Sequence, residues 1–323
     1  MISIFNPLVS ICIPSFNSEK YIEKTLTSLF NQTYQHLEII VVDDGLTDNT
    51  IHKLASIKDS RFTFTVQQNK GASAARNKAY SLSTGEYIKF MDADDLINPD
   101  FINAQLNKIL LHPGCIASAK WGRFYHNDIS TFKLSPEKIW KDLRGIDWLI
   151  ESLVDSGGNM MQPGIFLIPR YIIETAGPWN EQLSLIDDFD YMTRVILTAE
   201  NILFCEDSVL MYRSGGSGNL SGQKSSGHLQ SAFNALNLGI ANILQSRNDT
   251  TSRLASANTY QRWAYQFYPQ RKDLCKQAEK KIQELGGSDI EIEGGKALVL
   301  LSKILGWKMA LQIKLLLQKN LPK

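Results

Sequence analysis

The sequence predicts an α/β fold, with a Rossmann-like, mostly parallel central sheet followed by a helical C-terminal region. Short apolar runs alternate with stretches of helical periodicity through about residue 110. That alternation is typical of parallel strands joined by right-handed helical crossovers. From about residue 227 to the end the pattern is mostly helical. With 323 residues, 43% of them apolar, the chain is long enough for one large α/β domain with an appendage or for two medium domains.

The elements before residue 110 are predicted from local pattern. Apolar runs indicate strands of a buried sheet, and apolar residues recurring at three- and four-residue spacing indicate helices. The runs predict strands at 8–14, 37–42, 61–66 and 86–91. The helical spacing predicts helices at 21–30, from about 47, at 71–82 and from Pro99.

The section from about 115 to 220 has a less regular pattern. The glycine- and serine-rich run at 214–226 predicts a loop. The rest of the section predicts strands at 115–125, 164–168, 202–206 and 209–212, and a helix at 188–197 that starts in acidic residues.

Charge balance and cysteine spacing argue against several classes of protein. The formal net charge is +1, whereas a dedicated nucleic-acid binder normally carries a basic excess. The four cysteines are scattered and include no CxxC, so neither a disulfide framework nor a zinc knuckle is expected, and a reducing cytoplasmic setting fits. The sequence shows no signal-peptide pattern and no uncharged apolar stretch long enough to span a membrane. A cytoplasmic location is therefore expected.

Acidic residues follow two of the predicted strands. In open parallel sheets ligands bind outside the carboxyl ends of the strands, and carboxylates at alternate positions can project towards one cavity. Carboxylate oxygens are what Mg²⁺ or Mn²⁺ prefers, and such a metal would neutralise the charge on a departing nucleoside diphosphate. Solvated acidic turns remain the alternative. The acids are Asp43 and Asp44 after the second strand, and Asp92, Asp94 and Asp95 after the fourth.

Two further segments carry polar groups suited to a site. Residues 69–77 are rich in small side chains, which would keep a pocket open, and Arg76 could face a nucleotide or its phosphates. An ordinary surface arginine is the alternative. Asp187, Asp188 and Asp190 stand near a predicted helix start, where they could favour the helix dipole. One of them could instead be the general base for an acceptor hydroxyl, with burial raising its pKa.

These segments, in this order, resemble the glycosyltransferase family 2 enzymes of the GT-A fold. The resemblance covers roughly residues 7–220. It implies hexosyl transfer, with inversion, from a nucleotide-diphosphate sugar (a UDP-sugar above all) to an acceptor hydroxyl in cell-surface polysaccharide or lipid-linked glycan synthesis. It rests on VSICIPSFNSEKYIEKTLTSLFNQTY, EIIVVDDGLTD, NKGASAARNKA, GEYIKFMDADD and GPWNEQL followed by DDFDYMTR.

The expected organisation follows that resemblance. A GT-A domain is expected at 1–220, and a helical C-terminal region at 221–323. Within the domain, a nucleotide-binding half is expected at about 1–95 and an acceptor half at about 96–220.

The resemblance also implies residues on the donor side. Asp44 would be the acid that contacts the base, with Asp43 beside it, and Arg76 would be a donor-side arginine. Leu46 stands where the family usually has serine, which should perturb the hydrogen bonding of the turn without abolishing binding. The nucleotide pocket would be lined by Pro14, Ser15, Phe16 and Asn17.

The resemblance assigns the metal and the base as well. Asp92 and Asp94 would be the Asp-x-Asp pair around Ala93, with Asp94 the direct ligand of Mn²⁺ or Mg²⁺. Asp188 matches the second acid of the family's Glu-Asp motif and would be the catalytic base, with Asp187 in place of the usual glutamate. After Arg213 the family often has a histidine, but Ser214-Gly215-Gly216-Ser217 follows here, so no third protein ligand can be named.

Other enzyme classes fit less well. The chain lacks both the G-x-G-x-x-G of a dinucleotide-binding domain and the G-x-x-x-x-G-K-[ST] of a P-loop. A sugar-phosphate nucleotidyltransferase would carry a basic glycine-rich loop where Ser15-Phe16-Asn17-Ser18 stands. A non-catalytic glycan- or nucleotide-binding relative is a further alternative, against which the presence of Asp94 and Asp188 argues.

The C-terminal segment 294–323 contains six lysines and no acid, interleaved with apolar residues at roughly helical spacing. One interpretation is a helix lying on the inner face of an anionic membrane, which would suit a lipid-linked acceptor. The other is a helix that packs its apolar face on its own protein, with the lysines in water. The sequence does not choose between them.

Overall fold

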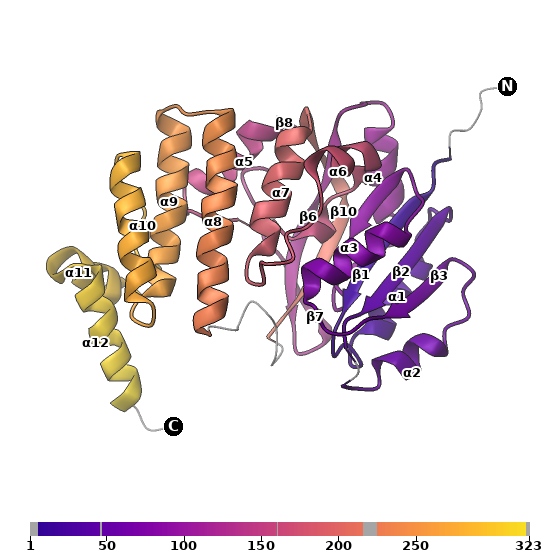
Figure 1. Ribbon diagram of the computed structural model, residues 1–323, viewed down its shortest axis with the longest axis horizontal. Helices are drawn as coiled ribbons and strands as arrows, with labels where there is room; N and C mark the ends of the chain where they lie inside the picture. Colours follow the sequence, from indigo (N-terminus) through magenta and orange to yellow (C-terminus); the bar gives the residue numbers. More distant parts are fainter. Residues whose placement is uncertain (1–5, 46, 160, 216–224, 321–323) are drawn as a thin grey trace. The chain divides into compact units, whose positions relative to one another are not determined.

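The computed structural model describes residues 6–45, 47–159, 161–215 and 225–320. They form two compact units (Figure 1), one comprising residues up to 149 together with 161–215, and the other comprising 150–159 together with residues from 225 onwards. The segment 150–159 thus groups with the C-terminal helices, although it lies far from them in sequence. Leu46 and most of the predicted 214–226 loop fall outside the described residues. The division at 220 stays a prediction.

The first unit contains the predicted parallel sheet. Its strands lie in the order β3-β2-β1-β4-β9, with β1 to β4 parallel and β9 antiparallel at the edge. In this register Ser15 lies opposite Asp43, so the carboxyl ends of β1 and β2 meet at one edge. The strands are β1 (Val9–Ser15), β2 (Leu37–Asp43), β3 (Phe62–Val66), β4 (Tyr87–Phe90) and β9 (Ile168–Pro169).

Four helices connect the parallel strands and the next sheet. Helix α3 packs on β1 and β2, and helix α4 packs on β6 and β10. Pro99 lies just before α4, which begins at Phe101 with Asp100 as its N-cap, so the expected helix starts two residues later. The helices are α1 (Ile22–Phe30), α2 (Thr50–Ala55), α3 (Ala72–Leu82) and α4 (Phe101–Ile109).

A second sheet, in the order β5-β10-β6-β7, completes this unit. The two short strands expected at 202–206 and 209–212 are one strand, β10, whose pairing shifts register between Cys205 and Val209. Antiparallel pairing of β5 with β10 begins directly after the Asp92–Asp95 loop, so this loop is fixed at its far end. The strands are β5 (Leu96–Ile97), β6 (Ile116–Tyr125), β7 (Asp128–Leu134), β8 (Leu143–Arg144) and β10 (Asn201–Ser214).

The prediction of a strand at 164–168 is wrong for most of that range. Residues Pro163–Ile165 form a 3₁₀ turn, and only β9 follows it. The physical reason is Lys89, a fully buried lysine of β4 whose ammonium group donates to the carbonyl oxygens of Gly164 and Phe166. Burial lowers the pKa of Lys89 well below its ordinary value, and the turn carbonyls accept two hydrogen bonds from its amino group.

Three more helices lie between residues 145 and 198, and the sequence predicted only α7 among them. They are α5 (Gly145–Val154), α6 (Arg170–Ala176) and α7 (Asp187–Thr198).

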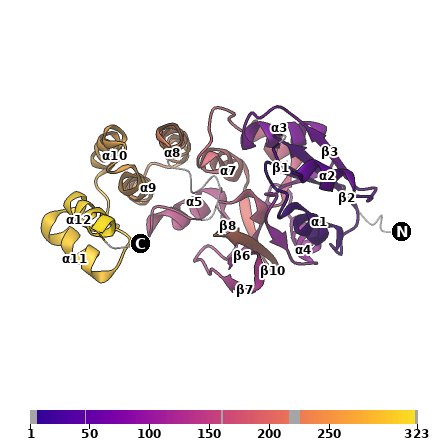
Figure 2. The ribbon, with the colours of Figure 1, turned by 90° about the horizontal axis from the view of Figure 1, so that it is seen from below.

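The second unit is helical, as predicted. Helix α9 packs on α8 and α10 (Figure 2). It begins with a capping box between Asp249 and Ser252. Asn258 of α9 holds the 150–159 segment by donating to the carbonyl oxygen of Val154 at 2.5 Å. No helix among the described residues is both long and apolar enough to cross a membrane. The helices are α8 (Ser226–Ser246), α9 (Thr250–Phe267), α10 (Lys272–Leu285), α11 (Lys296–Leu305) and α12 (Trp307–Asn320).

Candidate active site

The loop between β4 and β5 carries three aspartates that differ in burial. Asp95 is fully buried; it accepts hydrogen bonds from the backbone N–H of Arg213 at 3.0 Å and from the side-chain amide of Gln162. Asp92 and Asp94 are half-buried. The third acid of the DADD segment therefore anchors the loop, whereas the alternating pair that the sequence singled out is only half-buried.

Arg76 brings this loop together with the start of α7. Its guanidinium donates to Asp92 Oδ1 at 2.8 Å and to Asp187 Oδ2 at 3.0 Å, and it lies 4.5 Å from the ring centroid of Trp179. Ser73, one turn earlier on α3, also donates to Asp187 Oδ2 at 2.7 Å. The side chain of Arg76 is only 8% exposed, so it is not the ordinary surface arginine of the alternative interpretation.

Asp188 lies beside that bridge at the N-terminus of α7. The preceding residue, Ile186, adopts a left-handed conformation with φ 54°, which is unusual for a β-branched residue and marks a constrained turn. Burial and the neighbouring Asp187 raise the pKa of Asp188 to about 7, although Arg76 opposes the shift. A carboxylate with this pKa is a better proton acceptor at neutral pH than an ordinary aspartate.

Asp94 lacks a direct side-chain partner among the described residues. It forms no ion pair with a described residue, and only its backbone carbonyl is engaged by Arg213, at 2.8 Å. Burial and the charge of Asp92 raise the pKa of the Asp94 carboxyl to about 7. Arg76 and Arg213 are the two guanidinium groups bound at this cluster, against five acids: Asp92, Asp94, Asp95, Asp187 and Asp188.

This donor set fits a divalent cation held partly by substrate. The described residues contain no group of three His, Cys, Asp or Glu side chains arranged to hold a metal. Mg²⁺ and Mn²⁺, however, are commonly bound by one or two carboxylates, with diphosphate oxygens and water completing the shell. Asp94 and Asp92 offer such a pair. The cluster holds more carboxyl groups than guanidinium groups, and a cation would neutralise the negative charge that this excess leaves.

The ends of β1 and β2 provide the other predicted residues. Asp43 is buried, which raises its pKa, and it accepts from Ser15 Oγ and from the N–H of Gly45, both at 3.2 Å. Pro14 and Ser15 are buried within β1, whereas Phe16 is 49% exposed and Asn17 is exposed. Of the four residues expected to line the nucleotide pocket, Phe16 and Asn17 therefore present their side chains outward.

Asp44 is the most heavily bonded acid of this edge. Its Oδ1 accepts from Gln67 Nε2 at 2.8 Å and from the N–H of Lys70 at 2.9 Å, and its Oδ2 accepts from the N–H of Gly71 at 2.7 Å. Asp44 thus positions the segment that leads into α3. A base N–H could reach only the remaining acceptor position on Oδ2, so its predicted contact with the base stays a prediction.

Sequence reasoning missed three residues that support the loop. All three are buried: Arg213 and Gln162 donate hydrogen bonds to Asp95, and Trp179 stacks its ring against the guanidinium of Arg76. Trp179 stands within the GPWNEQL segment and Arg213 just before the expected histidine position, so both carried a signal. Gln162 carried none. Ala93 is buried, and its carbonyl accepts from Thr25 Oγ1 at 3.0 Å.

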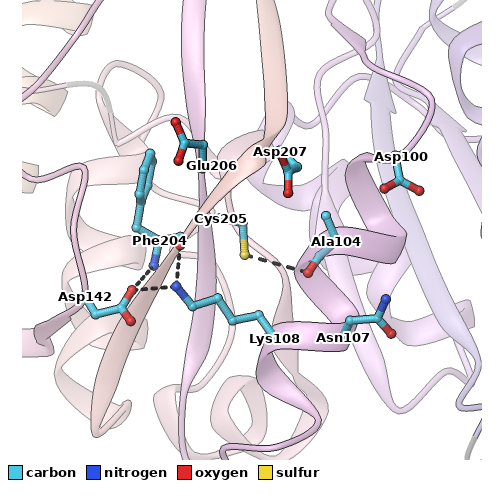
Figure 3. Close-up of a pocket in the computed structure, with 9 residues that line it drawn as sticks. All are labelled: Asp100, Ala104, Asn107, Lys108, Asp142, Phe204, Cys205, Glu206 and Asp207. Atoms are coloured by element: carbon cyan, nitrogen blue, oxygen red, sulfur yellow. Dashed lines mark hydrogen bonds and ion pairs between the residues drawn. The ribbon is translucent and has the colours of Figure 1, made fainter.

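The cavity of about 650 Å³ shown in Figure 3 lies outside this site. None of the predicted site residues lines it. Lys108 donates to Asp142 Oδ1 at 2.8 Å and to the carbonyl of Phe204 at 2.6 Å, and the N–H of Phe204 donates to Asp142 Oδ1 at 2.7 Å. These three polar groups satisfy one another, so they offer few open partners for a ligand.

Removing the guanidinium of Arg76 should destabilise the first unit. We expect Arg76→Met to lower the free energy of unfolding by about 3 kcal/mol, because Asp92 and Asp187 would lose their partner in a largely buried site. The measurement is urea denaturation. As a matched control, Arg144→Met removes the guanidinium of an exposed pair with Asp147 and should lower the free energy of unfolding far less, because water screens an exposed ion pair. Equal losses in the two variants would contradict the bridging role.

Comparison with known proteins places this geometry in a family. Residues 10–163 match the model of glycosyl transferase family 2. The glycosyltransferase GlyG of Streptococcus pneumoniae serotype 4 is 29% identical over 220 residues, covering 64% of this chain and 70% of GlyG. The UDP-Glc:alpha-D-GlcNAc-diphosphoundecaprenol beta-1,3-glucosyltransferase WfgD of Escherichia coli is 34% identical over 133 residues, covering 41% of this chain and 53% of WfgD. The chain spans only 30% of another relative, GlyA of the same S. pneumoniae strain.

A solved structure shares the fold. The crystal structure of S. aureus TarS 1-349 in complex with UDP-GlcNAc superposes with a TM-score of 0.67 at 18% identity, covering 94% of this chain and 90% of that one. The TM-score shows a common fold, which is the GT-A fold with C-terminal helices. By this family match, residues 10–163 of the chain belong to glycosyl transferase family 2.

Proposed function

We propose that this chain transfers a sugar from a nucleotide-diphosphate donor to an acceptor hydroxyl by a single displacement that inverts the anomeric carbon. The observation that carries the proposal is the Arg76 bridge, which sets the Asp92–Asp94 loop beside the Asp187–Asp188 turn. A donor-binding pair of carboxylates thereby lies next to a carboxylate whose pKa, about 7, suits a general base.

Asp188 accepts the proton of the acceptor hydroxyl as its oxygen forms a bond to the anomeric carbon from one face. The bond from that carbon to the diphosphate breaks on the opposite face, and the nucleoside diphosphate leaves with the electron pair. A divalent cation bound by Asp94 and Asp92 would supply the positive charge that this leaving group requires.

A UDP-sugar is the proposed donor, and a cell-surface or lipid-linked glycan the proposed acceptor. WfgD is named for a UDP-Glc donor and a diphosphoundecaprenol-linked acceptor, and TarS has been crystallised with UDP-GlcNAc. In this chain the exposed ring of Phe16 stands at the end of β1, close to Asp43, where it offers an apolar face to a nucleobase.

Thermal shift with UDP, GDP and dTDP, each with and without Mn²⁺, tests the donor site. We expect UDP with Mn²⁺ to raise the melting temperature, because a ligand at 100 times its Kd stabilises the folded state by about 2.7 kcal/mol. The other two diphosphates should give smaller shifts. An unchanged melting temperature for folded protein with all three would contradict a donor site, and a shift without any release of sugar from UDP-sugars would favour a non-catalytic relative.

A further inference from the structure

The helices α11 and α12, labelled in Figure 1, expose many apolar side chains. They are joined at Gly306, whose φ of 79° makes the turn between them. Of the large hydrophobic side chains that are exposed in the described residues, seven of sixteen lie on these two helices. They are Leu300 at 60%, Ile304 at 69%, Leu305 at 50%, Met309 at 50%, Leu315 at 37%, Leu316 at 61% and Leu317 at 62%.

These side chains are not simply a poorly packed core, because the helices already bury another face. Leu298 and Ala310 form a small cluster with Ile292, against which Leu301 and Tyr265 pack. Trp307 contacts the rings of Tyr265 and Tyr268 edge-on, with centroids 5.0 and 5.5 Å apart. The seven exposed residues listed above lie outside that cluster, and we call them the tail surface.

The spacing of the tail surface follows the helical repeat. Leu300 and Ile304 are four residues apart on α11, and Met309 and Leu316 are seven apart on α12, so the members of each pair share a face. Lys296 stands four residues before Leu300 and Lys303 three residues after it, so both lie on the side of α11 that carries Leu300. The arrangement is an apolar stripe with lysines along its border.

The charge of the segment selects the partner. The sequence from 294 to 323 has six lysines and no acid. Two of these lysines pair with acids elsewhere in this unit: Lys303 with Glu291 at 2.6 Å and Lys308 with Glu279 at 2.7 Å. Lys296 and Lys314 have no ion pair among the described residues. Lys296 and Lys314 therefore leave two exposed positive charges on the helices that carry the apolar side chains.

We propose that the tail surface binds an anionic lipid membrane, with its apolar side chains at the boundary between headgroups and acyl chains and its lysines at the lipid phosphates. An amphipathic helix with lysines beside its apolar face binds membranes in this way, through apolar burial and attraction to anionic lipids. A second copy of the chain would fit less well, because two lysine-rich surfaces would repel each other. This inference does not depend on the transfer reaction proposed above.

Co-sedimentation of the full chain with vesicles tests the proposal. We expect it to sediment with vesicles of phosphatidylcholine and phosphatidylglycerol, and much less with vesicles of phosphatidylcholine alone. Lys296→Gln with Lys314→Gln should weaken binding to the anionic vesicles by about 25-fold, since each lysine near the surface contributes about a fivefold factor. Raising the salt concentration should weaken binding of the unmodified chain.

Substitutions on the apolar stripe test the other half of the proposal. Ile304→Asp with Leu316→Asp should reduce vesicle binding by at least about tenfold, while circular dichroism and the UDP thermal shift stay unchanged. Leu111→Asp is the matched control, because Leu111 is 79% exposed but lies on the first unit, and it should bind as the unmodified chain does. The proposal would be overturned if the stripe variant bound anionic vesicles as well as the unmodified chain does, or if the unmodified chain bound neutral vesicles as well as anionic ones. A dimer in solution that the stripe variant abolishes, without any vesicle binding, would overturn it too.

Discussion

Asp188→Asn should lower the rate of sugar transfer by at least about 100-fold while leaving the affinity for UDP with Mn²⁺ nearly unchanged. A positioned general base contributes roughly 10²- to 10⁴-fold, and asparagine keeps the shape of the side chain but cannot accept the proton. The measurement is kcat with a UDP-sugar and a suitable acceptor, together with the UDP thermal shift. Equal loss of transfer and donor binding would contradict the assigned role.

The matched control for this variant is Asp190→Asn. Asp190 lies in the same first turn of α7, but it pairs with Arg194 at 3.0 Å and does not contact Arg76. Its substitution removes one charge from the helix start without removing the proposed base. We therefore expect it to retain most of the transfer rate, which would separate the role of Asp188 from a general effect of charge.

The pH dependence of stability provides a second check on Asp188. Its folded-state pKa is raised to about 7, above the value near 3.9 of an unfolded aspartate, so the folded chain holds the proton more tightly. Its contribution to stability is therefore present below about pH 4 and is lost as the pH rises towards 7. Asparagine does not titrate, so at pH 8 the melting temperature of Asp188→Asn should equal or exceed that of the unmodified chain.

Asp94→Asn should remove the Mn²⁺-dependent part of the UDP thermal shift and lower kcat/KM by about 100-fold or more. A cation that neutralises a departing diphosphate is worth several kcal/mol, and Asp94 is the proposed ligand without an ion-pair partner among the described residues. The measurement is a Mn²⁺ titration of both the thermal shift and the transfer rate. Below pH 7 the metal must displace the proton that the raised pKa of Asp94 retains, so apparent Mn²⁺ affinity should rise with pH and level off above it.

Asp207→Asn controls for metal bound elsewhere. Asp207 is exposed and lines the cavity of Figure 3, an acidic surface that could attract Mn²⁺ without serving the donor. Its substitution should leave the titration unchanged. If Asp207→Asn removed the metal dependence and Asp94→Asn did not, the Asp-x-Asp assignment would be wrong.

Local pattern was sufficient for the parallel sheet because each strand carries its own signal. The run expected at 37–42 is β2 (Leu37–Asp43), and the run at 86–91 is β4 (Tyr87–Phe90). The acids at their ends could be located for the same reason, since a strand end fixes where the next side chains emerge. Their assigned roles in binding and catalysis stay predictions.

Partners distant in sequence decided the rest. The 163–165 turn depends on a lysine of β4, and nothing around residue 164 shows that its carbonyls will meet a buried ammonium. Asp95 could not be told apart from Asp92 and Asp94 by residue type, because its burial depends on Gln162 and Arg213. Likewise, the two bonds of Arg76 join segments whose proximity follows only from the assembled fold.

The Arg76 bridge has a thermodynamic consequence. One guanidinium serves two carboxylates, Asp92 on the donor loop and Asp187 beside the proposed base. Any ligand that competes for Asp92 changes how much of that single positive charge remains for Asp187, and through it the field at Asp188. The two halves of the site are therefore not independent: occupancy on one side alters the free energy of occupancy on the other, and by reciprocity the reverse holds to the same extent.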